Sequence, residues 1–175
     1  MPPPPGRDVK LLVEEVVPKF TDAGYILEFR LEDGRVFRLY GIPPEVASGV
    51  NKMKEGYSYE IFANRESVFD ALVDLKEFIK DLLDKIDRVV ISELDYNTGL
   101  YTAEIEFNLG GIVLRKRMIP SHAIYLALLA GKPIYVSKRL VDEQEMYELE
   151  MLRLEEEEES EEEEEGEEGE EEFGP

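Results

Sequence analysis

The chain has 175 residues and a formal net charge of −21, from 41 Asp and Glu against 20 Lys and Arg. Residues 155–175 hold 15 Glu and no basic residue, so residues 1–154 carry 26 acidic and 20 basic residues, a net charge of −6. The absence of Cys excludes disulfides, a thiolate nucleophile and Cys-based zinc sites, and a single His excludes a two-histidine metal motif. No apolar run approaches the roughly 18 residues of a membrane-spanning helix and no signal-peptide pattern is present, so we expect a cytoplasmic protein without membrane contact.

After a Pro-rich, flexible lead over residues 1–8, the first half of the chain has the pattern of three strands, a short helix and a fourth strand. Apolar–polar alternation and β-branched residues predict the strands, over residues 9–17, 25–31, 36–40 and 57–62. Asp33-Gly34 is a hairpin turn signal. Because Pro suits a first helical turn, we expect the helix to start at Pro44 and to end before Gly56.

The strongest helical pattern of the chain covers residues 66–86. Apolar residues recur at steps of three and four, with acids and lysines between them, at Val68, Leu72, Leu75, Ile79, Leu82 and Ile86. The pattern predicts one helix that packs on a sheet and joins the two halves of a domain.

The second half repeats the order of the first. Strands are expected, over residues 88–94, 101–107, 112–118 and 134–136. A helix begins at Pro120-Ser121, with Ser121 as its cap, and ends near Gly131. The junctions Ile42-Pro43 and Ile119-Pro120 lie 77 residues apart.

The repeated order predicts an α+β domain over residues 9–154, built from a duplicated β3-α-β unit with halves 9–62 and 88–137. Hairpin connections make the sheet mostly antiparallel, with the helices outside. Eight strands in two equivalent halves can close into a wide barrel, which removes exposed edges. Residues 155–175 are expected to form a disordered tail, because blocks of like charge repel.

Two segments of the second half carry a recognisable motif. The first is Arg88-Val89-Val90-Ile91-Ser92-Glu93-Leu94, followed after a turn by Tyr101-Thr102-Ala103. The second is Pro120-Ser121-His122-Ala123-Ile124-Tyr125-Leu126-Ala127-Leu128, followed by Pro133-Ile134-Tyr135-Val136. Over residues 86–143 the chain resembles the bifunctional nuclease (BFN) domain family.

The resemblance implies a duplicated α+β fold closed into a wide barrel, a homodimer, and the hydrolysis of both RNA and DNA, an activity of some plant members. Ile119 and His122 stand where the family pattern has Arg and Asp, and Asn64-Arg65-Glu66-Ser67 lacks the His of the family's first-half segment. A divergent member that keeps the fold and lacks the activity is therefore an alternative.

Three residues are candidates for catalysis. A neutral His122 in a first helical turn can act as a general base, beside Ser121, and Glu93 matches an acidic position of the family. Glu93, Glu104 and Glu106 are also candidate ligands of Mg²⁺ or Mn²⁺, because oxygen ligands suit these ions in phosphodiester cleavage. The other interpretations are a structural first-turn His and a solvated strand face.

Basic residues gather after the second hairpin, and their phosphate contacts would position RNA or DNA: these are Arg115, Lys116, Arg117 and Lys132. Cross-strand ion pairs of Arg115 or Arg117 with Glu104 or Glu106 are the alternative. Several tyrosines could stack bases, but their strand or helix spacing favours core or interface packing: Tyr57, Tyr59, Tyr96, Tyr101, Tyr125 and Tyr135.

The sequence thus leaves three hypotheses open. The first is a metal-assisted nuclease that acts on RNA or DNA. The second is a non-catalytic binding or assembly module of the same fold, whose acidic tail contacts a basic partner or competes with nucleic acid for the basic strand. The third is a barrel with an interior site for a small ligand.

Overall fold

The computed structural model describes the backbone of residues 8–171 and the side chains of residues 8–163. All but the last residue of the predicted lead thus lies outside the described residues. The chain divides into two compact units, Met1–Val141 and Asp142–Pro175. None of the helices within the described range is long and apolar enough to cross a bilayer.

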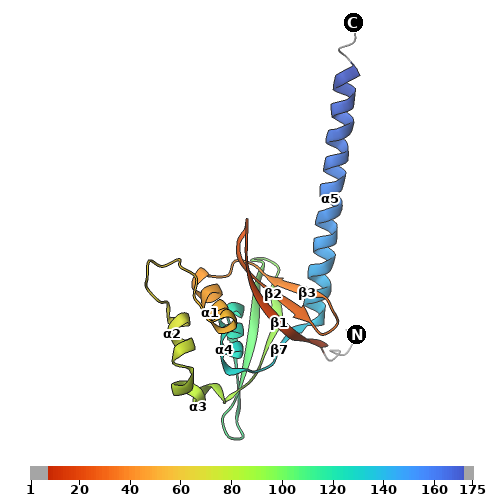
Figure 1. The fold of residues 1–175 in the computed structure, drawn as a ribbon. Helices are drawn as coiled ribbons and strands as arrows, with labels where there is room; N and C mark the ends of the chain where they lie inside the picture. The colour runs from red at the N-terminus through yellow and green to blue at the C-terminus, as the bar shows by residue number, and fades with distance from the viewer. Residues whose placement is uncertain (1–7, 172–175) are drawn as a thin grey trace, which may run out of the picture. The chain divides into compact units, whose positions relative to one another are not determined.

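The first unit is built on one seven-stranded sheet with the order β3-β2-β1-β7-β4-β5-β6 (Figure 1). The strands are β1 (Lys10–Thr21), β2 (Gly24–Leu31), β3 (Val36–Leu39), β4 (Ile86–Asp95), β5 (Leu100–Asn108), β6 (Val113–Met118) and β7 (Ile134–Ser137). Neighbouring strands are antiparallel except β4 and β7. β1 joins the two halves, because residues 10–12 pair with β7 and the strand from Val13 onward, which contains a bulge, pairs with β2.

Helices α1 and α4 lie side by side against this sheet (Figure 1). The helices are α1 (Pro44–Glu55), α2 (Val68–Asp74), the 3₁₀ turn η1 (Lys76–Ile79), α3 (Lys80–Leu83), α4 (Pro120–Ala130) and α5 (Lys138–Glu171). Gly49 of α1 permits a close approach, because a Cβ there would lie 2.8 Å from the Cβ of Phe69 and 2.9 Å from Cε2 of Tyr125. The core is thus formed between one face of the sheet and these two helices.

The predicted α+β class and the mostly antiparallel sheet are confirmed, but the barrel is wrong. The sheet is open, and β3 and β6 are its two edges. Residues 57–62 form a loop instead of the eighth strand. Their polar groups bond to α1: the backbone N–H of Tyr59 donates to Ser48 Oγ (2.9 Å), and Asn51 Nδ2 donates to the carbonyl of Tyr57 (3.0 Å). Without that strand each half has three strands and a helix, and β7 alone lies between the halves.

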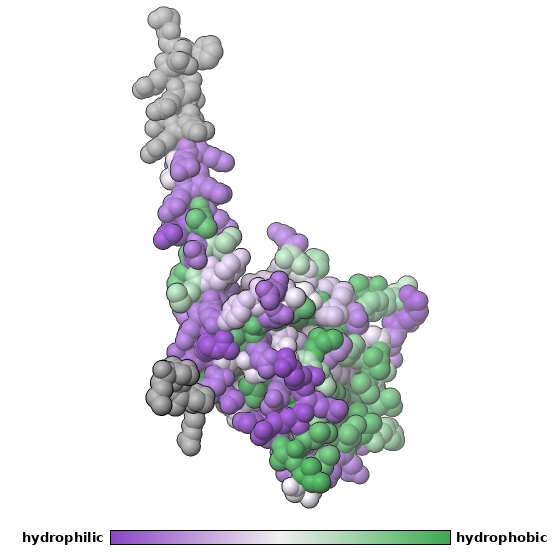
Figure 2. All heavy atoms as spheres, turned by 180° about the vertical axis from the view of Figure 1, so that it is seen from behind, coloured by the Kyte–Doolittle hydropathy of each residue, from purple (hydrophilic) through white to green (hydrophobic). Residues whose placement is uncertain are grey.

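The predicted helix over residues 66–86 is also wrong as a single element. It is broken into α2, η1 and α3, and Ile86 begins β4 opposite Phe107. Much of the expected core stripe is exposed, as Val68 (62%) and Leu82 (61%) show. Figure 2 shows apolar surface on the side where these helices lie. A helix gains most of its stability from packing along its length, so the segment gives up helical turns where Ile86 is buried in the sheet instead.

The second unit consists of α5 beyond Val141. Its backbone is helical through Glu171, whereas the sequence predicts disorder from residue 155. Glu has a good helix propensity, and the helix already started at Lys138 extends without a new nucleation step. Repulsion between like charges at i and i+4 opposes this extension. The rest of the predicted tail, residues 172–175, lies outside the described residues.

Candidate nucleic-acid interface

Charged side chains form a ladder across β4, β5 and β6. Arg115 Nε lies 3.1 Å from Glu106 Oε2 and 3.8 Å from Glu104 Oε1, and Arg88 Nη2 lies 3.6 Å from the same Glu106 oxygen. Alternate residues of a strand point to opposite faces, so Glu104 and Glu106 lie on the face opposite buried Ile105. The predicted cross-strand ion pairs are therefore present for Arg115.

Arg117 pairs with Glu93 instead of with Glu104 or Glu106. The two side chains meet across β5, with Arg117 Nη2 at 2.7 Å from Glu93 Oε2. They are 68% and 51% exposed, respectively. An ion pair this exposed contributes only about 0–1 kcal/mol, so a competing anion such as a phosphate can separate it at little cost.

The candidate metal ligands do not fit a preformed Mg²⁺ or Mn²⁺ site. Glu93, Glu104 and Glu106 each contact an arginine, so guanidinium groups occupy the positions that a cation would take. Among the described residues no group of three or more His, Cys, Asp and Glu side chains could hold a metal ion. The ladder is a set of ion pairs.

Two of the other basic candidates, Lys116 and Lys132, lie away from Arg117. Lys116 is opposite Ile105 in the β5–β6 register, so it projects from the other face of the sheet. Lys132 follows α4, and its charge acts on Asp84 at the end of α3, where the hydrogen bond from Lys80 is the larger cause of a lowered Asp84 pKa. Lys116 and Lys132 thus lie apart from Arg117, whereas Arg115 projects from the same face of β6 as Arg117.

Ser121 and His122 begin α4 but point to different surroundings. Ile119 is the N-cap and Pro120 the first helical residue, so Ser121 is not the predicted cap, because the helix starts one residue earlier. The His122 ring is half-buried and packs against Phe69 of α2, with ring centroids 5.4 Å apart. Ser121 is 4% exposed and lines a pocket.

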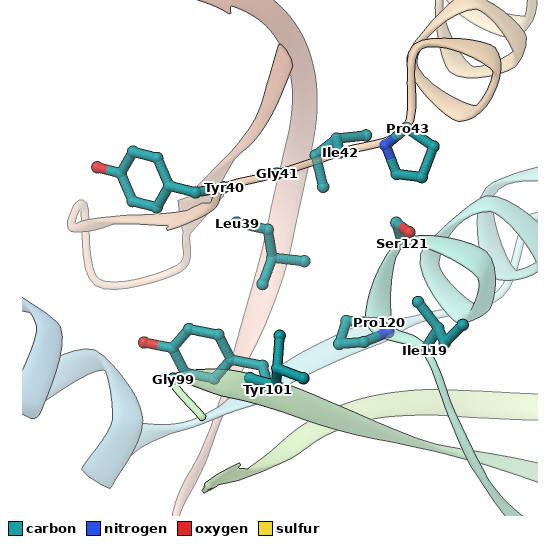
Figure 3. A pocket seen from close by; sticks show the side chains of 11 residues that line it. Leu39, Tyr40, Gly41, Ile42, Pro43, Gly99, Tyr101, Ile119, Pro120 and Ser121 are labelled. Atoms are coloured by element: carbon teal, nitrogen blue, oxygen red, sulfur yellow. The ribbon is translucent and has the colours of Figure 1, made fainter. Parts of the chain in front are cut away.

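That pocket lies between the start of α1 and the start of α4 (Figure 3). It has a volume of about 230 Å³ and is lined mainly by apolar groups, from Leu39 to Pro43 on one side and from Ile119 to Ser121 on the other. A second hollow of about 510 Å³ is lined by Arg117, Met118 and Thr102. The two hollows share Leu100, Tyr101, Ile119 and Pro120 and therefore adjoin. We call the pair of hollows the junction groove.

Arg117 and Ser121 line different hollows of the junction groove, and Glu93 contacts Arg117. A family model for the bifunctional nuclease domain matches residues 61–148, half of the chain. The chain belongs to the bifunctional nuclease domain family. No match is found among curated proteins.

The BFN match covers one wall of the junction groove, including Tyr101, Arg117 and Ser121, and leaves out the wall formed by Leu39–Pro43. Sequence reasoning singled out Arg117 and Ser121 but missed Tyr40 and Ile42. The repeated Ile-Pro junctions could have identified these two residues, because equivalent points of a duplicated fold meet near its centre.

Sequence reasoning also missed a buried carboxylate in this BFN chain. Asp70 of α2 is 1% exposed, and it accepts hydrogen bonds from the hydroxyls of Ser58 (2.9 Å), Ser48 (3.2 Å) and Ser67 (3.2 Å). Ser67 in turn caps α2 through the backbone N–H of Asp70. Burial, and then the charge of Asp70, raise the pKa of the Tyr125 phenol, which donates to the backbone carbonyl of Phe69. This cluster holds α2 and the preceding loop on α1.

Proposed function

We propose that the protein binds RNA or DNA along the junction groove and hydrolyses a phosphodiester bond beside Glu93 and Arg117. The observation that supports this most is the pairing itself. A guanidinium suited to bind phosphate lines a concave site and lies 2.7 Å from a carboxylate that can act as a base. Membership of the bifunctional nuclease domain family supports the same reaction class.

In the proposed reaction a phosphate oxygen takes the place of Glu93 on Arg117. The freed carboxylate accepts a proton from a water molecule, and the water oxygen attacks phosphorus. The bond from phosphorus to the leaving sugar oxygen breaks, and that oxygen takes a proton from solvent. Arg117 stabilises the charge that develops on the phosphate oxygens. The proposed step assigns no role to His122, whose ring packs on Phe69.

The test is a cleavage assay on single- and double-stranded RNA and DNA, with Mg²⁺, with Mn²⁺ and with EDTA. We expect Glu93→Gln to lower the rate about 10²–10⁴-fold, the usual contribution of a general base, and to leave oligonucleotide binding intact. His122→Ala is the matched control and should keep the wild-type rate. A Glu93→Gln preparation as active as the wild type would contradict the proposal.

The ion-pair ladder favours a second candidate function, a non-catalytic binding module. Each acidic candidate of the hairpin is held by an arginine, and α5 presents exposed Glu side chains from 155 to 163, interrupted by Ser160. Such a helix suits a basic partner. Absence of cleavage under every metal condition, together with salt-sensitive binding of a Lys-rich peptide that is lost on truncation after Leu154, would favour this function over hydrolysis.

We also propose that two copies associate through β6. This strand is an edge of the sheet, and it starts with the exposed apolar residues Val113 (50%) and Leu114 (39%). An open edge with apolar side chains is a surface for pairing with another strand. Light scattering after size exclusion should give twice the chain mass for the wild type and the single mass for Val113→Lys. A monomeric wild type would contradict the proposal.

A further inference from the structure

The pocket of the junction groove is built from equivalent pieces of the two halves. Ile42 and Pro43 on one wall correspond to Ile119 and Pro120 on the other, 77 residues later. Each pair leads into a helix, α1 of 12 residues or α4 of 11, that has a Pro in its first turn and no side-chain cap. The positive ends of both helix dipoles therefore lie at the pocket.

The two ends of the groove differ in chemistry although their positions in the repeat correspond. Arg117 comes 77 residues after Tyr40. Arg117 lies within β6, and Tyr40 directly follows β3. Tyr40 is 56% exposed, and the Tyr101 ring is held edge-on against Phe37 at 5.3 Å. Figure 3 shows the Tyr40 and Tyr101 rings on one side of the pocket, and Pro43, Pro120 and Ser121 on the other. One end thus offers aromatic rings and the other offers a cation.

A buried hydroxyl also faces the pocket. Ser121 is 4% exposed, and its hydroxyl makes no hydrogen bond to any residue that the structure describes. No fully enclosed polar side-chain atom in the same part of the chain lacks a partner. The Ser121 hydroxyl therefore opens into the pocket, where a ligand can bond to it.

We infer that the pocket takes one unpaired base of a single-stranded RNA or DNA, with a neighbouring phosphate on Arg117. The inference rests on the proposed function only because it assigns a phosphate to Arg117. Binding of the base itself requires no hydrolysis. A volume of about 230 Å³ is below the roughly 300–1,000 Å³ of pockets for drug-sized ligands, which suits a single ring system. Tyrosine faces stack any base, and Ser121 bonds to its polar edge.

A pocket for one unpaired base also favours single-stranded over double-stranded nucleic acid. A base in a duplex must be unpaired and unstacked before it enters such a pocket, which costs a few kcal/mol. In a single strand no base pair has to be broken, so the free-energy cost of moving one base into the pocket is much smaller. Single strands should therefore bind more tightly than duplexes of the same length, although both present phosphates to Arg117.

The experiment compares a fluorescein-labelled single-stranded oligonucleotide with the same strand containing abasic sites, at 4 °C in EDTA with the full chain. The abasic strand keeps every phosphate and lacks the bases. Stacking is worth about 1–3 kcal/mol per base, so we expect the normal strand to bind about 5–150-fold more tightly. Tyr40→Ala and Ser121→Ala should reduce this ratio, whereas Arg117→Ala should weaken both strands equally.

Tyr57→Ala is the matched control, because Tyr57 is similarly exposed (60%) and lies outside the junction groove. It should keep the wild-type ratio. Equal affinity of the wild type for the normal and abasic strands would overturn the inference. If Arg117→Ala still weakened the binding of both strands, the proposed phosphate contact would remain supported. A ratio lowered as much by Tyr57→Ala as by Tyr40→Ala would also overturn it. Failure to cleave while the ratio persists would separate base binding from the proposed hydrolysis.

Discussion

The two halves of the sheet share an ion-pair arrangement at equivalent positions. In the first half, Glu28 of β2 lies between Lys19 (2.8 Å) and Arg38 (3.3 Å). In the second half, Glu106 of β5 lies between Arg88 and Arg115. Both carboxylates are mostly buried, with side chains 11% and 15% exposed. A motif that occurs in both halves, away from the junction groove, is best explained by the packing of three strands.

The halves differ next to this shared motif. The second half adds the exposed pair of Glu93 and Arg117, and Tyr40 occupies the first-half position equivalent to Arg117. The first half replaces its fourth strand with a loop that the Asp70 cluster holds in place. The shared ion pairs therefore stabilise the sheet, while the residues without an equivalent in the other half mark where the two halves have specialised.

The largest stability effect is expected at Asp70, the residue that holds the loop specific to the first half. Asp70→Ala leaves the hydroxyls of Ser48, Ser58 and Ser67 without their acceptor, and we expect the free energy of unfolding to fall by about 3 kcal/mol. Chemical denaturation measures this change. Asp74→Ala, at an exposed carboxylate paired with Lys52, should cost about 1 kcal/mol or less. Equal losses for both variants would refute a special role for the Asp70 cluster.

A medium effect is expected at Glu28, as a test of the shared motif. The hydrogen bond from Lys19 lowers the pKa of Glu28 below its usual 4.5, against the opposing effect of burial. A lowered pKa means that the folded state favours the carboxylate, so the added stability is present above pH 4.5 and is lost as the pH falls through the folded-state pKa.

Glu28→Gln should therefore be about 1–3 kcal/mol less stable than the wild type at pH 7, with a difference that shrinks below pH 4.5. Denaturant unfolding between pH 3 and pH 7 measures it. Glu104→Gln, at a side chain that is 42% exposed, is the control and should change stability by less than about 0.5 kcal/mol. If the Glu28→Gln deficit stayed constant over this range, ionisation of Glu28 would not be its cause.

The smallest effect is expected from the second unit. If the Glu-rich part of α5 competes with nucleic acid for Arg117, truncation after Leu154 should strengthen oligonucleotide binding a few-fold at low salt. The gain should disappear at about 1 M salt, where the Debye length falls to about 3 Å. The truncated chain should keep the unfolding free energy of the first unit. Unchanged binding at low salt would exclude competition by the tail.

Local pattern predicted much of the fold. Alternation along Tyr101–Phe107 placed β5 correctly, because strand neighbours depend on period and turn length. Ion pairs of Arg115 with Glu104 and Glu106 were one of the two interpretations that the sequence left open for the basic strand. The breaks in residues 66–86 were not foreseen, because the apolar stripe has the right spacing for a helix. The structure interrupts the helix at Lys76–Ile79 and buries Ile86 in β4. The strand predicted over residues 57–62 was wrong for a similar reason. The Asp70 cluster and α1 form hydrogen bonds with polar groups of this segment, so no neighbouring strand is needed to pair them.

The sequence by itself determined the duplicated order of strands and helices, the family and the separation of a strongly acidic C-terminal segment from a mildly acidic domain, because these depend on period, motif and composition. The tertiary structure alone decided that the sheet stays open, that Glu93 meets Arg117 while His122 packs on Phe69, and that Tyr40 and Ser121 face one pocket from opposite halves. Those contacts join residues tens of positions apart, and they depend on strand register and helix packing that no local pattern specifies.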